Sequence, residues 1–296
     1  ESACGAVDWP LTWVDGEPCG GAGISGIQAH LVSGVPVERV RLGGRPVGGI
    51  FDDGDARYCV LGDIRPENVS APPTAQARVL FERLEAALAE ARMKCTDVAR
   101  TWLFLDRILD WYNDFNPVRT QFFSERKLFD ALVPASTGIG AVNPAGAAMA
   151  AEAIALQSPG GRVTVTELPS PLQCTARAYG SSFSRAVELA APGTRQVLVS
   201  GTASIEPGGK TAHVGDMPAQ VDLVMRVIEA ILASRGMGFA DVSRAIAYIK
   251  EPEDAPHFAR WCAERGLPDF PAIVAHDAVC RDDLLFEVEL DAIAEA

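Results

Sequence analysis

The sequence predicts an α+β protein built from two tandem copies of one domain, each a mixed β-sheet with two helices packed on one face. Residues 74–105 align without a gap with residues 218–249, which lie 144 positions later, and ten of the 32 columns are identical. Composition alone would give roughly two matches, so we interpret the repeat as a duplicated structural unit. Both copies also follow the element order ββαβαββ. A chain of 296 residues is long enough for two domains, each with its own core.

The first copy shows this order with several departures. Its expected elements are a strand at 57–63, a helix beginning near Thr74, a second helix at 111–123, and final strands at 136–141 and 147–156. Residues 1–50 are rich in Gly, Pro and Val and precede this copy as an extension whose elements the pattern does not define. Residues 158–161 (SPGG) are the best linker candidate. The predicted domains are therefore 51–158 and 162–296.

The second copy is the clearer of the two. Its expected elements are strands at 185–189 and 195–204, a helix at 216–235, a strand at 242–249, a helix at 256–265, and strands at 272–279 and 284–292. The turn Ala191-Pro192-Gly193 separates the first two strands. Asp216 is placed to cap the first helix, whose apolar residues fall on one face, and Gly236 is placed to end it. Two helices on one face of a mixed sheet follow from this order.

Charge and hydropathy exclude two classes of partner. The formal net charge of −13 argues against binding to nucleic acid or to an acidic membrane surface. No apolar run approaches the roughly 18 to 20 residues that a membrane span requires. If the substrate is an anion, individual Arg and Lys side chains must hold it against this background.

The cysteines and histidines indicate a cytoplasmic protein without a metal site. Seven scattered cysteines, an odd number with no CxxC pair, fit reduced thiols better than a disulfide framework. The four histidines lack HxxxH or HExxH spacing, so we expect no protein-ligated metal. The first ten residues have no basic start followed by an apolar stretch, so we expect no signal peptide.

Several short motifs resemble those of the Rid (YjgF/UK114) family. Residues 182–187 (SFSRAV) stand where that family has its PYSQAV hairpin, 199–201 (VSG) match its VSG strand, and 271–272 (PA) with 285–289 (LFEVE) match its PARS…LVEIE ending. The first half shows weaker similarity to this family at 115–116, 122–123, 134–137 and 152–155. The expected fold is therefore two tandem Rid/YjgF-like (chorismate-mutase-like) domains.

The tandem layout looks like the chorismatases in particular. Two fused copies with an N-terminal extension carry the strings YGSSFSRA (179–186), RTWLFL (100–105), WYNDFN (111–116) and TGIG (137–140). This resemblance, which covers about residues 55–296, implies a cofactor-free enzyme that removes pyruvate from chorismate. Rid domains are typically trimers with sites between subunits, and a fused pair could close part of that interface internally. The sequence therefore leaves two alternatives for the oligomeric state, a monomer and a homotrimer.

The departures from the Rid pattern point to the second copy. The family implies an arginine in PARS that binds a substrate carboxylate and a first glutamate in VEIE that positions water. In the second copy Ile273 replaces the arginine, while Glu287 keeps the glutamate. In the first copy Ser136 and Ala150 stand at these positions, so both groups are gone. We therefore expect the chemistry in the second copy, with the first copy serving mainly as its packing partner.

Glu287 is the predicted general acid. Chorismate carries two carboxylates and an enol ether, so its site needs two anion clamps, an acid that protonates the ether, and walls that exclude water. The neighbours of Glu287 in sequence are apolar, and partial desolvation would raise its pKa and keep its proton available. The alternative is that Glu287 faces solvent. Because alternation puts Glu287 and Glu289 on one face, one of them could be a surface charge.

Cys280 is the second predicted catalytic residue. As the resemblance implies, one chorismatase branch hydrolyses the ether to a dihydroxycyclohexadiene carboxylate, and another makes 3-hydroxybenzoate by attack within the substrate. A cysteine seven positions before the glutamate looks like the hydroxybenzoate branch, where a thiol can relay a proton during aromatisation. The mass balance agrees, because chorismate equals hydroxybenzoate plus pyruvate with no net water. The alternative for Cys280 is a small buried apolar residue.

Candidate substrate contacts surround these two residues. Arg185 is the leading anion clamp, followed by Arg177 and by Lys250, for which Glu251 is a plausible salt-bridge partner. Tyr179 could donate to a ring hydroxyl, and Gly201 with Thr202 would let the backbone approach the ligand. Arg119 and Tyr112 of the first copy could line the domain interface, but we do not include them among the predicted contacts.

The sequence thus predicts a cytoplasmic chorismatase of the 3-hydroxybenzoate-forming type, without cofactor. The hydrolytic branch is the alternative within the enzyme class. An alternative of another class is a catalytically inactive Rid-like module that binds a small acid. A divergent imine deaminase is disfavoured by the missing PARS arginine.

Overall fold

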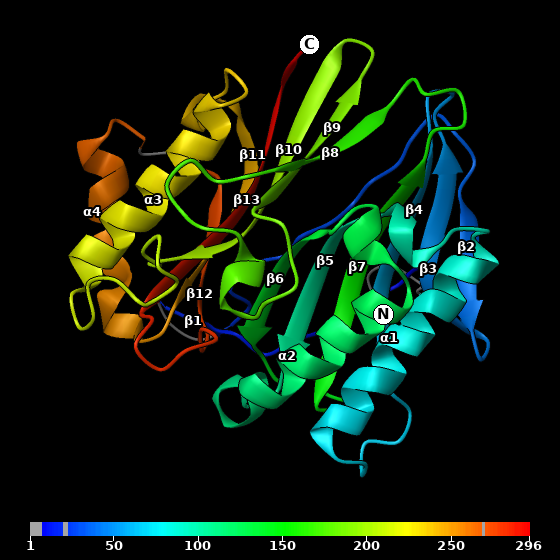
Figure 1. The fold of residues 1–296 in the computed structure, drawn as a ribbon, viewed down its shortest axis with the longest axis horizontal. Coiled ribbons are helices and arrows are strands. Elements are labelled where there is room, and N and C mark those ends of the chain that lie inside the picture. The colour runs from blue at the N-terminus through cyan, green and yellow to red at the C-terminus, as the bar shows by residue number, and fades with distance from the viewer. Residues whose placement is uncertain (1–7, 20–22, 268–269) are drawn as a thin grey trace.

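The computed structural model describes residues 8–19, 23–267 and 270–296, which form two sheets with two long helices each (Figure 1). Residues 1–7, on which the expectation of no signal peptide partly rests, lie outside the described residues. Within the described ranges, no helix has both the length and the apolar character needed to cross a bilayer.

The first sheet has six strands and is antiparallel except between its last two strands. Its order is β2 (Glu38–Leu42), β3 (Arg45–Asp52), β4 (Arg57–Ile64), β7 (Met149–Gln157), β5 (Val98–Leu105) and β6 (Ala135–Gly140). Helices α1 (Pro73–Glu90) and α2 (Ile108–Glu125) cover one face of this sheet (Figure 1). Only β5 and β6 run parallel, and α2 makes the crossover between them.

The second sheet repeats this order and adds one strand. Its order is β1 (Glu17–Pro18), β12 (Ala272–His276), β11 (Val242–Ile249), β13 (Phe286–Glu295), β10 (Thr194–Ala203), β9 (Ala186–Ala191) and β8 (Thr164–Leu168). Helices α3 (Met217–Ala233) and α4 (Ala255–Glu264) cover one of its faces (Figure 1). Strands β8 and β9 occupy the places that β2 and β3 have in the first sheet.

The repeated unit therefore begins earlier than the sequence pattern indicated. Strands β2 and β3 lie within residues 1–50, which the sequence analysis treated as an extension, yet β3 pairs with β4 along its whole length. The proposed boundaries at 51–158 and 162–296 stay a prediction. Both copies contain the expected order ββαβαββ, preceded in each by one further strand, β2 or β8.

Local sequence signals explain how α3 begins and ends. The Asp216 carboxylate accepts a hydrogen bond from the Ala219 backbone N–H, and Pro218 occupies the first turn, where its missing donor costs nothing. After Ser234, Gly236 adopts a positive φ of 71°, which stops the helix. The apolar face between these ends is buried against the second sheet, so the predicted helix is confirmed.

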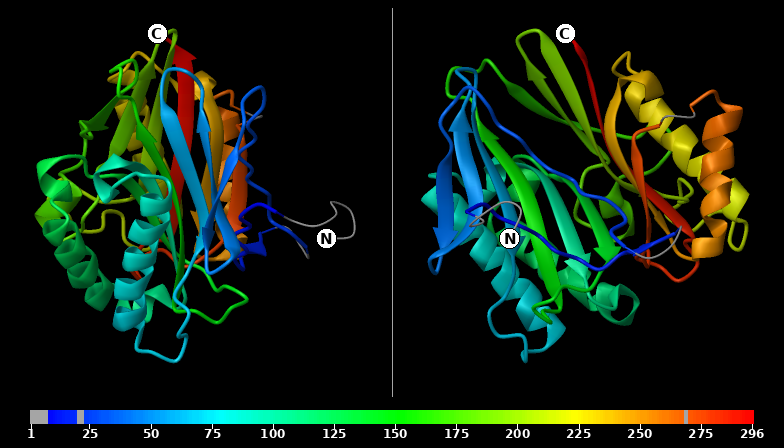
Figure 2. Two further views of the ribbon diagram at one scale, coloured as in Figure 1. Left: turned by 90° about the vertical axis from the view of Figure 1, so that its right-hand side faces the viewer. Right: turned by 180° about the vertical axis from the view of Figure 1, so that it is seen from behind.

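The faces of the two sheets that carry no helix meet in the centre of the molecule (Figure 2). Trp102 and Ile139 of the first sheet share one apolar cluster with Tyr248 and Leu284 of the second half. At the edge of this contact, the backbone N–H of Ser184 donates to the Pro134 carbonyl at 3.0 Å, beside strand β6. The edge strand of one copy is thus joined to the other copy.

The N-terminal segment also links the two halves. Thr12 accepts a hydrogen bond from the Asp63 N–H at 2.8 Å, and the Asp15 N–H donates to the Val142 carbonyl at 2.8 Å, both in the first half. Strand β1 then pairs with β12 of the second sheet. In the view from behind, this segment crosses both sheets (Figure 2).

Candidate active site

A pocket lies where β6 of the first half meets β10 and β13 of the second. The first half lines it with Tyr112, Arg119, Ser136 and Gly138. The second half lines it with Tyr179, Ser181, Phe183, Arg185, Gly201, Ala203, Ile205, Cys280, Arg281, Leu284 and Glu287. Both copies therefore build the site. The empty space between these side chains is about 500 Å³, including the part that opens to solvent.

A bulge in β10 places the Glu287 carboxyl in this pocket. The register between β10 and β13 shifts between Val199 and Thr202, and Gly201 lies within this shift. A Cβ on Gly201 would collide with the Glu287 carboxyl and lie 3.2 Å from the Thr137 methyl group. Because Gly201 has no side chain, the carboxyl rests directly against the backbone of β10.

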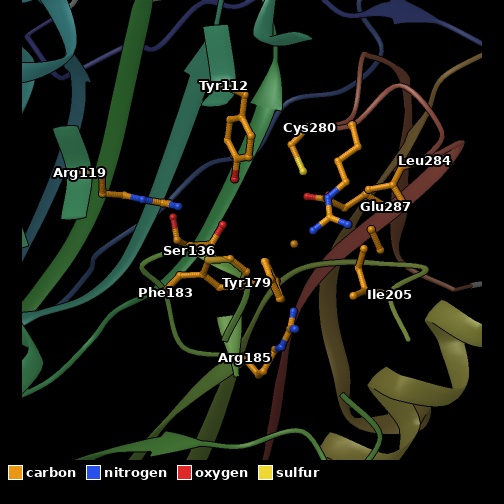
Figure 3. A pocket seen from close by; sticks show the side chains of 15 residues that line it. Tyr112, Arg119, Ser136, Tyr179, Phe183, Arg185, Ile205, Cys280, Leu284 and Glu287 are labelled. Atoms are coloured by element: carbon orange, nitrogen blue, oxygen red, sulfur yellow. The ribbon is translucent and has the colours of Figure 1, made fainter. Parts of the chain in front are cut away.

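Glu287 is uncharged at neutral pH in this environment. It is 4% exposed, and burial together with the nearby Glu289 carboxylate raises its pKa from 4.5 to about 8. The Arg100 and Arg185 guanidinium groups lower this pKa but do not outweigh the burial. The side chain is thus a protonated acid that faces the pocket (Figure 3).

Three arginines line the same pocket. Arg185, 4% exposed, donates through Nε and Nη2 to the Cys174 carbonyl at 3.0 and 2.8 Å, and its guanidinium lies over the ring of Tyr179. Arg119 donates through Nη2 to Asn116 Oδ1 at 2.7 Å, and its Nε has no hydrogen-bond partner among the described residues. Both side chains point into one space (Figure 3).

The third arginine, Arg281, lines the pocket from the second half. Its Nη1 donates to the Gly209 carbonyl at 2.9 Å, and its guanidinium lies 5.2 Å from the centre of the Tyr179 ring. The pocket therefore holds three guanidinium groups and one neutral carboxyl. This local excess of positive charge suits an anionic ligand, in contrast to the net charge of the chain.

Cys280 and Tyr112 face this space from opposite halves (Figure 3). Burial, followed by the nearby Glu287 carboxyl, raises the pKa of the Cys280 thiol to about 12, so it keeps its proton at neutral pH. Burial also raises the pKa of the Tyr112 hydroxyl. The Tyr112 ring packs over Gly138, with 3.8 Å from its Cε2 to the place of a Cβ. A neutral thiol and a neutral phenol can pass protons but are not nucleophiles in these states.

Known proteins with related sequences carry chorismatase names. A 3-hydroxybenzoate synthase of Streptomyces hygroscopicus is 32% identical in an alignment 265 residues long, which covers 80% of this chain and 74% of that protein. The chain belongs to the chorismatase family. A chorismatase of Streptomyces rapamycinicus is also 32% identical, in an alignment 217 residues long that covers 65% of this chain and 63% of the relative, so the match spans less than two thirds of that relative.

A solved structure agrees with this family at the level of the fold. A chorismatase crystal structure superposes with a TM-score of 0.69 at 22% identity and covers 97% of this chain and 100% of its own. The predicted fold class of two tandem Rid-like domains is confirmed. No family model matches the sequence.

The structure brings five of the eight predicted site residues together in one pocket. Glu287, Cys280, Arg185, Tyr179 and Gly201 all line the pocket. Gly201 was expected to let the backbone approach the ligand. In the structure, the atoms that fill the space next to its backbone belong to Glu287.

The other three predicted contacts do not line the pocket. Arg177 is exposed, with its guanidinium 4.3 Å from the centre of the Phe129 ring. Lys250 donates to the carbonyl and the carboxylate of Asp282, at 2.6 and 2.9 Å, rather than to the expected Glu251. Thr202 is buried, and its hydroxyl donates to the Ser200 carbonyl at 2.8 Å. Because successive residues of a strand face opposite sides of the sheet, the Thr202 side chain points to the side opposite that of Gly201.

The first copy contributes more to the pocket than its sequence indicated, and Glu289 is more buried than expected. Arg119 and Tyr112 line the pocket although we had not included them as contacts, and Arg281 was not considered. Glu289 is fully buried rather than a surface charge. The buried charge of Arg119 on an otherwise apolar helix face was the one available signal, because such a charge needs a partner or a ligand.

No metal site is evident in the described part of the chain. It contains no group of three or more His, Cys, Asp or Glu side chains that could hold an ion. The six cysteines within it are free thiols.

Proposed function

We propose that the protein converts chorismate to 3-hydroxybenzoate and pyruvate without a cofactor. The observation that carries this proposal is the pocket composition: three arginines surround one protonated carboxyl, Glu287. A dianion with an acid-labile enol ether matches both features. The names of two relatives at 32% identity support the same substrate class.

Arg119 and Arg185 are the proposed carboxylate clamps. Each is buried and held by a hydrogen bond to a neighbouring oxygen, which fixes its orientation before a ligand arrives. Each also retains N–H groups for a ligand. A planar guanidinium can donate two parallel hydrogen bonds to a carboxylate. Because the two arginines come from different copies, the substrate would bridge the two halves.

Glu287 then supplies the proton that breaks the ether. Protonation of the enol ether methylene carbon by Glu287 is followed by cleavage of the bond between ring carbon and ether oxygen, and pyruvate leaves. The oxygen of the neighbouring ring hydroxyl attacks the vacated ring carbon and gives its proton to the Glu287 carboxylate, which restores the acid. The bond from this oxygen to its original ring carbon then breaks, the hydrogen on the carbon that now carries the oxygen leaves as a proton, and that proton ends on the phenol oxygen, so atoms and protons balance with no net water.

Cys280 supports the hydroxybenzoate branch. Its neutral thiol lies in the pocket next to Glu287 and can relay the proton that leaves the ring.

Product analysis tests this proposal. Purified protein is incubated with chorismate, ring products are resolved by chromatography, and pyruvate is quantified. We expect 3-hydroxybenzoate and pyruvate in equal amounts. A dihydroxycyclohexadiene carboxylate would instead indicate the hydrolytic branch. Absence of pyruvate would refute the enzyme and favour a module that binds a small acid. The cytoplasmic location and the choice between monomer and homotrimer stay predictions.

A further inference from the structure

Glu289 lies two residues after Glu287 on β13 and is enclosed by donors from both copies. It accepts hydrogen bonds from Arg100 Nη2 and from the Thr137 hydroxyl. Its other oxygen accepts from Trp102 Nε1 at 2.8 Å and from Arg244 Nη1 at 2.9 Å. The side chain has no exposed surface. Burial alone would raise the pKa of this carboxyl, but Arg244 and Arg100 outweigh it and hold the pKa below 4.5.

The two arginines are the same position in the two copies. Arg100 and Arg244 are 144 residues apart and form one of the ten identical pairs of the repeat. In the folded chain they converge on one carboxylate and lie over the ring of Trp102, at 4.7 and 5.2 Å from its centre. Arg244 has a second partner, since its Nε donates to the Asp291 carboxylate at 2.7 Å. Arg100 depends on Glu289 for its charge partner.

This network extends to the general acid through Thr137. The Thr137 hydroxyl oxygen accepts a hydrogen bond from Arg100 and one from the Gly201 N–H, at 2.6 and 3.1 Å. The Gly201 backbone in turn lies against the Glu287 carboxyl. Arg100 is fully buried, and among the described residues its Nε and Nη1 have no hydrogen-bond partner. A guanidinium with free donors thus lies near a carboxyl that must keep its proton.

Charged and titratable groups reach Glu287 from every element around it. These are Arg100 on β5, Tyr112 and Arg119 on α2, Arg185 before β9, Tyr248 on β11, Cys280 and Arg281 before β13, and Glu289. Burial raises the pKa of Tyr112, Tyr248 and Cys280, so these three remain neutral. The protonation of Glu287 therefore depends on the balance between Glu289 and the arginines, of which Arg100 and Arg185 lower the Glu287 pKa.

We propose that Glu289 is a positioning residue for the general acid: it binds Arg100 away from the Glu287 carboxyl and fixes a negative charge beside it, so that Glu287 keeps its proton. The catalytic meaning of this inference rests on the proposed function. Without Glu289, the buried Arg100 would be left with Asp291, which is already bound to Arg244, and with the Glu287 carboxyl. An arginine next to a carboxyl lowers the pKa of that carboxyl by about 1 to 3 units.

The test follows the protonation of Glu287 directly. The infrared C=O band of a protonated carboxyl is recorded against pH, and the Glu287 band is the one that is missing from Glu287→Gln. In Glu289→Gln we expect the midpoint of this band to fall by about 1 to 2 pH units. Adding Arg100→Met to Glu289→Gln should return it toward the wild-type value. The high-pH limb of kcat/KM for pyruvate release should move with the band.

Glu188→Gln is the matched control. Glu188 is also a largely buried glutamate held by two arginines, Arg195 at 2.7 Å and Arg235 at 3.0 Å, but it lies outside the pocket. Its removal should leave the Glu287 midpoint unchanged. An unchanged midpoint in folded Glu289→Gln would overturn the inference and leave Glu289 a structural residue.

Two further outcomes separate the possible failures. If Glu289→Gln does not fold, Arg100→Met is compared with the double variant that carries Arg100→Met and Glu289→Gln. The inference requires a lower midpoint of the Glu287 band in the double variant. Equal midpoints would refute it. If the midpoints shift as expected but wild-type protein releases no pyruvate, the proposed function fails while the electrostatic role of Glu289 holds.

Discussion

Two carboxyl groups on one strand, Glu287 and Glu289, carry different charges because their partners differ. Glu289 is bound by two arginines and stays ionised, whereas Glu287 faces the pocket and keeps its proton. Alternation on β13 told us that both share a face, but not that this face is buried between two sheets. That burial depends on the packing of the copies, which no local pattern contains.

The raised pKa of Glu287 has a consequence for stability. Above its ordinary pKa of 4.5 the unfolded chain loses this proton, while the folded protein keeps it to about pH 8. The free energy of unfolding contributed by this group therefore falls as pH rises from 4.5 to 8. Relative to that of Glu287→Gln, the free energy of unfolding of the wild-type protein should fall by about 1 kcal/mol per pH unit in this window.

Urea unfolding of both proteins between pH 5 and pH 8 measures this difference. Asp277, whose pKa burial raises to about 8, and Glu152, whose pKa burial raises to about 7, contribute equally to both proteins and cancel. Parallel stability curves would show that Glu287 is ionised throughout.

Cys280 should decide product more than rate. Because its thiol is neutral and lies in the pocket wall, Cys280→Ala removes a proton relay without removing the acid that breaks the ether. We expect the ratio of 3-hydroxybenzoate to other ring products to change at least about threefold, with pyruvate release within about fivefold of wild type. Chromatography of the products checks this, and an unchanged ratio would make Cys280 a packing residue.

Among the strands, the bulge in β10 controls where the acid lies. Gly201→Ala would place a methyl group where the Glu287 carboxyl now rests, so the carboxyl must leave its position. We expect kcat to fall about 100-fold, since small displacements of reacting groups have effects of this size. Gly238→Ala is the matched control, because a Cβ there meets open space at an ordinary φ of −144°. Equal activity of the two variants would contradict the role of the bulge.

Helix α2 brings the first copy into the site. Arg119→Met should lower kcat/KM for chorismate by about 10- to 100-fold, the effect of losing one charged hydrogen-bond donor of about 1.5 to 3 kcal/mol. Arg126→Met is the control, since Arg126 lies at the end of the same helix and pairs with Glu85 outside the pocket. If both variants retain full activity, the first copy does not hold the substrate.

The sequence predicted the elements well and their contacts less well. Periodicity and capping located α3 and β11 because these signals are local. Strand β3 was missed because its Pro46, Gly48 and Gly49 disfavour strands, and pairing with β4 overrides that preference. Arg119 was undervalued for a different reason: its place in the pocket arises because α2 lies beside β6, which joins the other copy.

For the molecule as a whole, the two copies contribute to the pocket differently from our expectation. The loss of the Rid residues at Ser136 and Ala150 predicted that the acid lies in the second copy, and Glu287 of that copy lines the pocket. The first copy is nevertheless more than a packing partner, because it lines the pocket with Arg119 and Tyr112 and supplies Arg100 to Glu289. The proposed function accordingly uses one acid from the second copy and one carboxylate clamp from each copy.

Pyruvate release from chorismate at pH 7, compared between wild-type protein and Glu287→Gln, tests this arrangement most directly. Circular dichroism verifies that the variant is folded. Wild-type protein should release one pyruvate for each chorismate consumed, and Glu287→Gln should be slower by about 10² to 10⁴, the contribution of a positioned general acid. A folded Glu287→Gln that releases pyruvate at the wild-type rate would contradict the assignment of Glu287 as the acid.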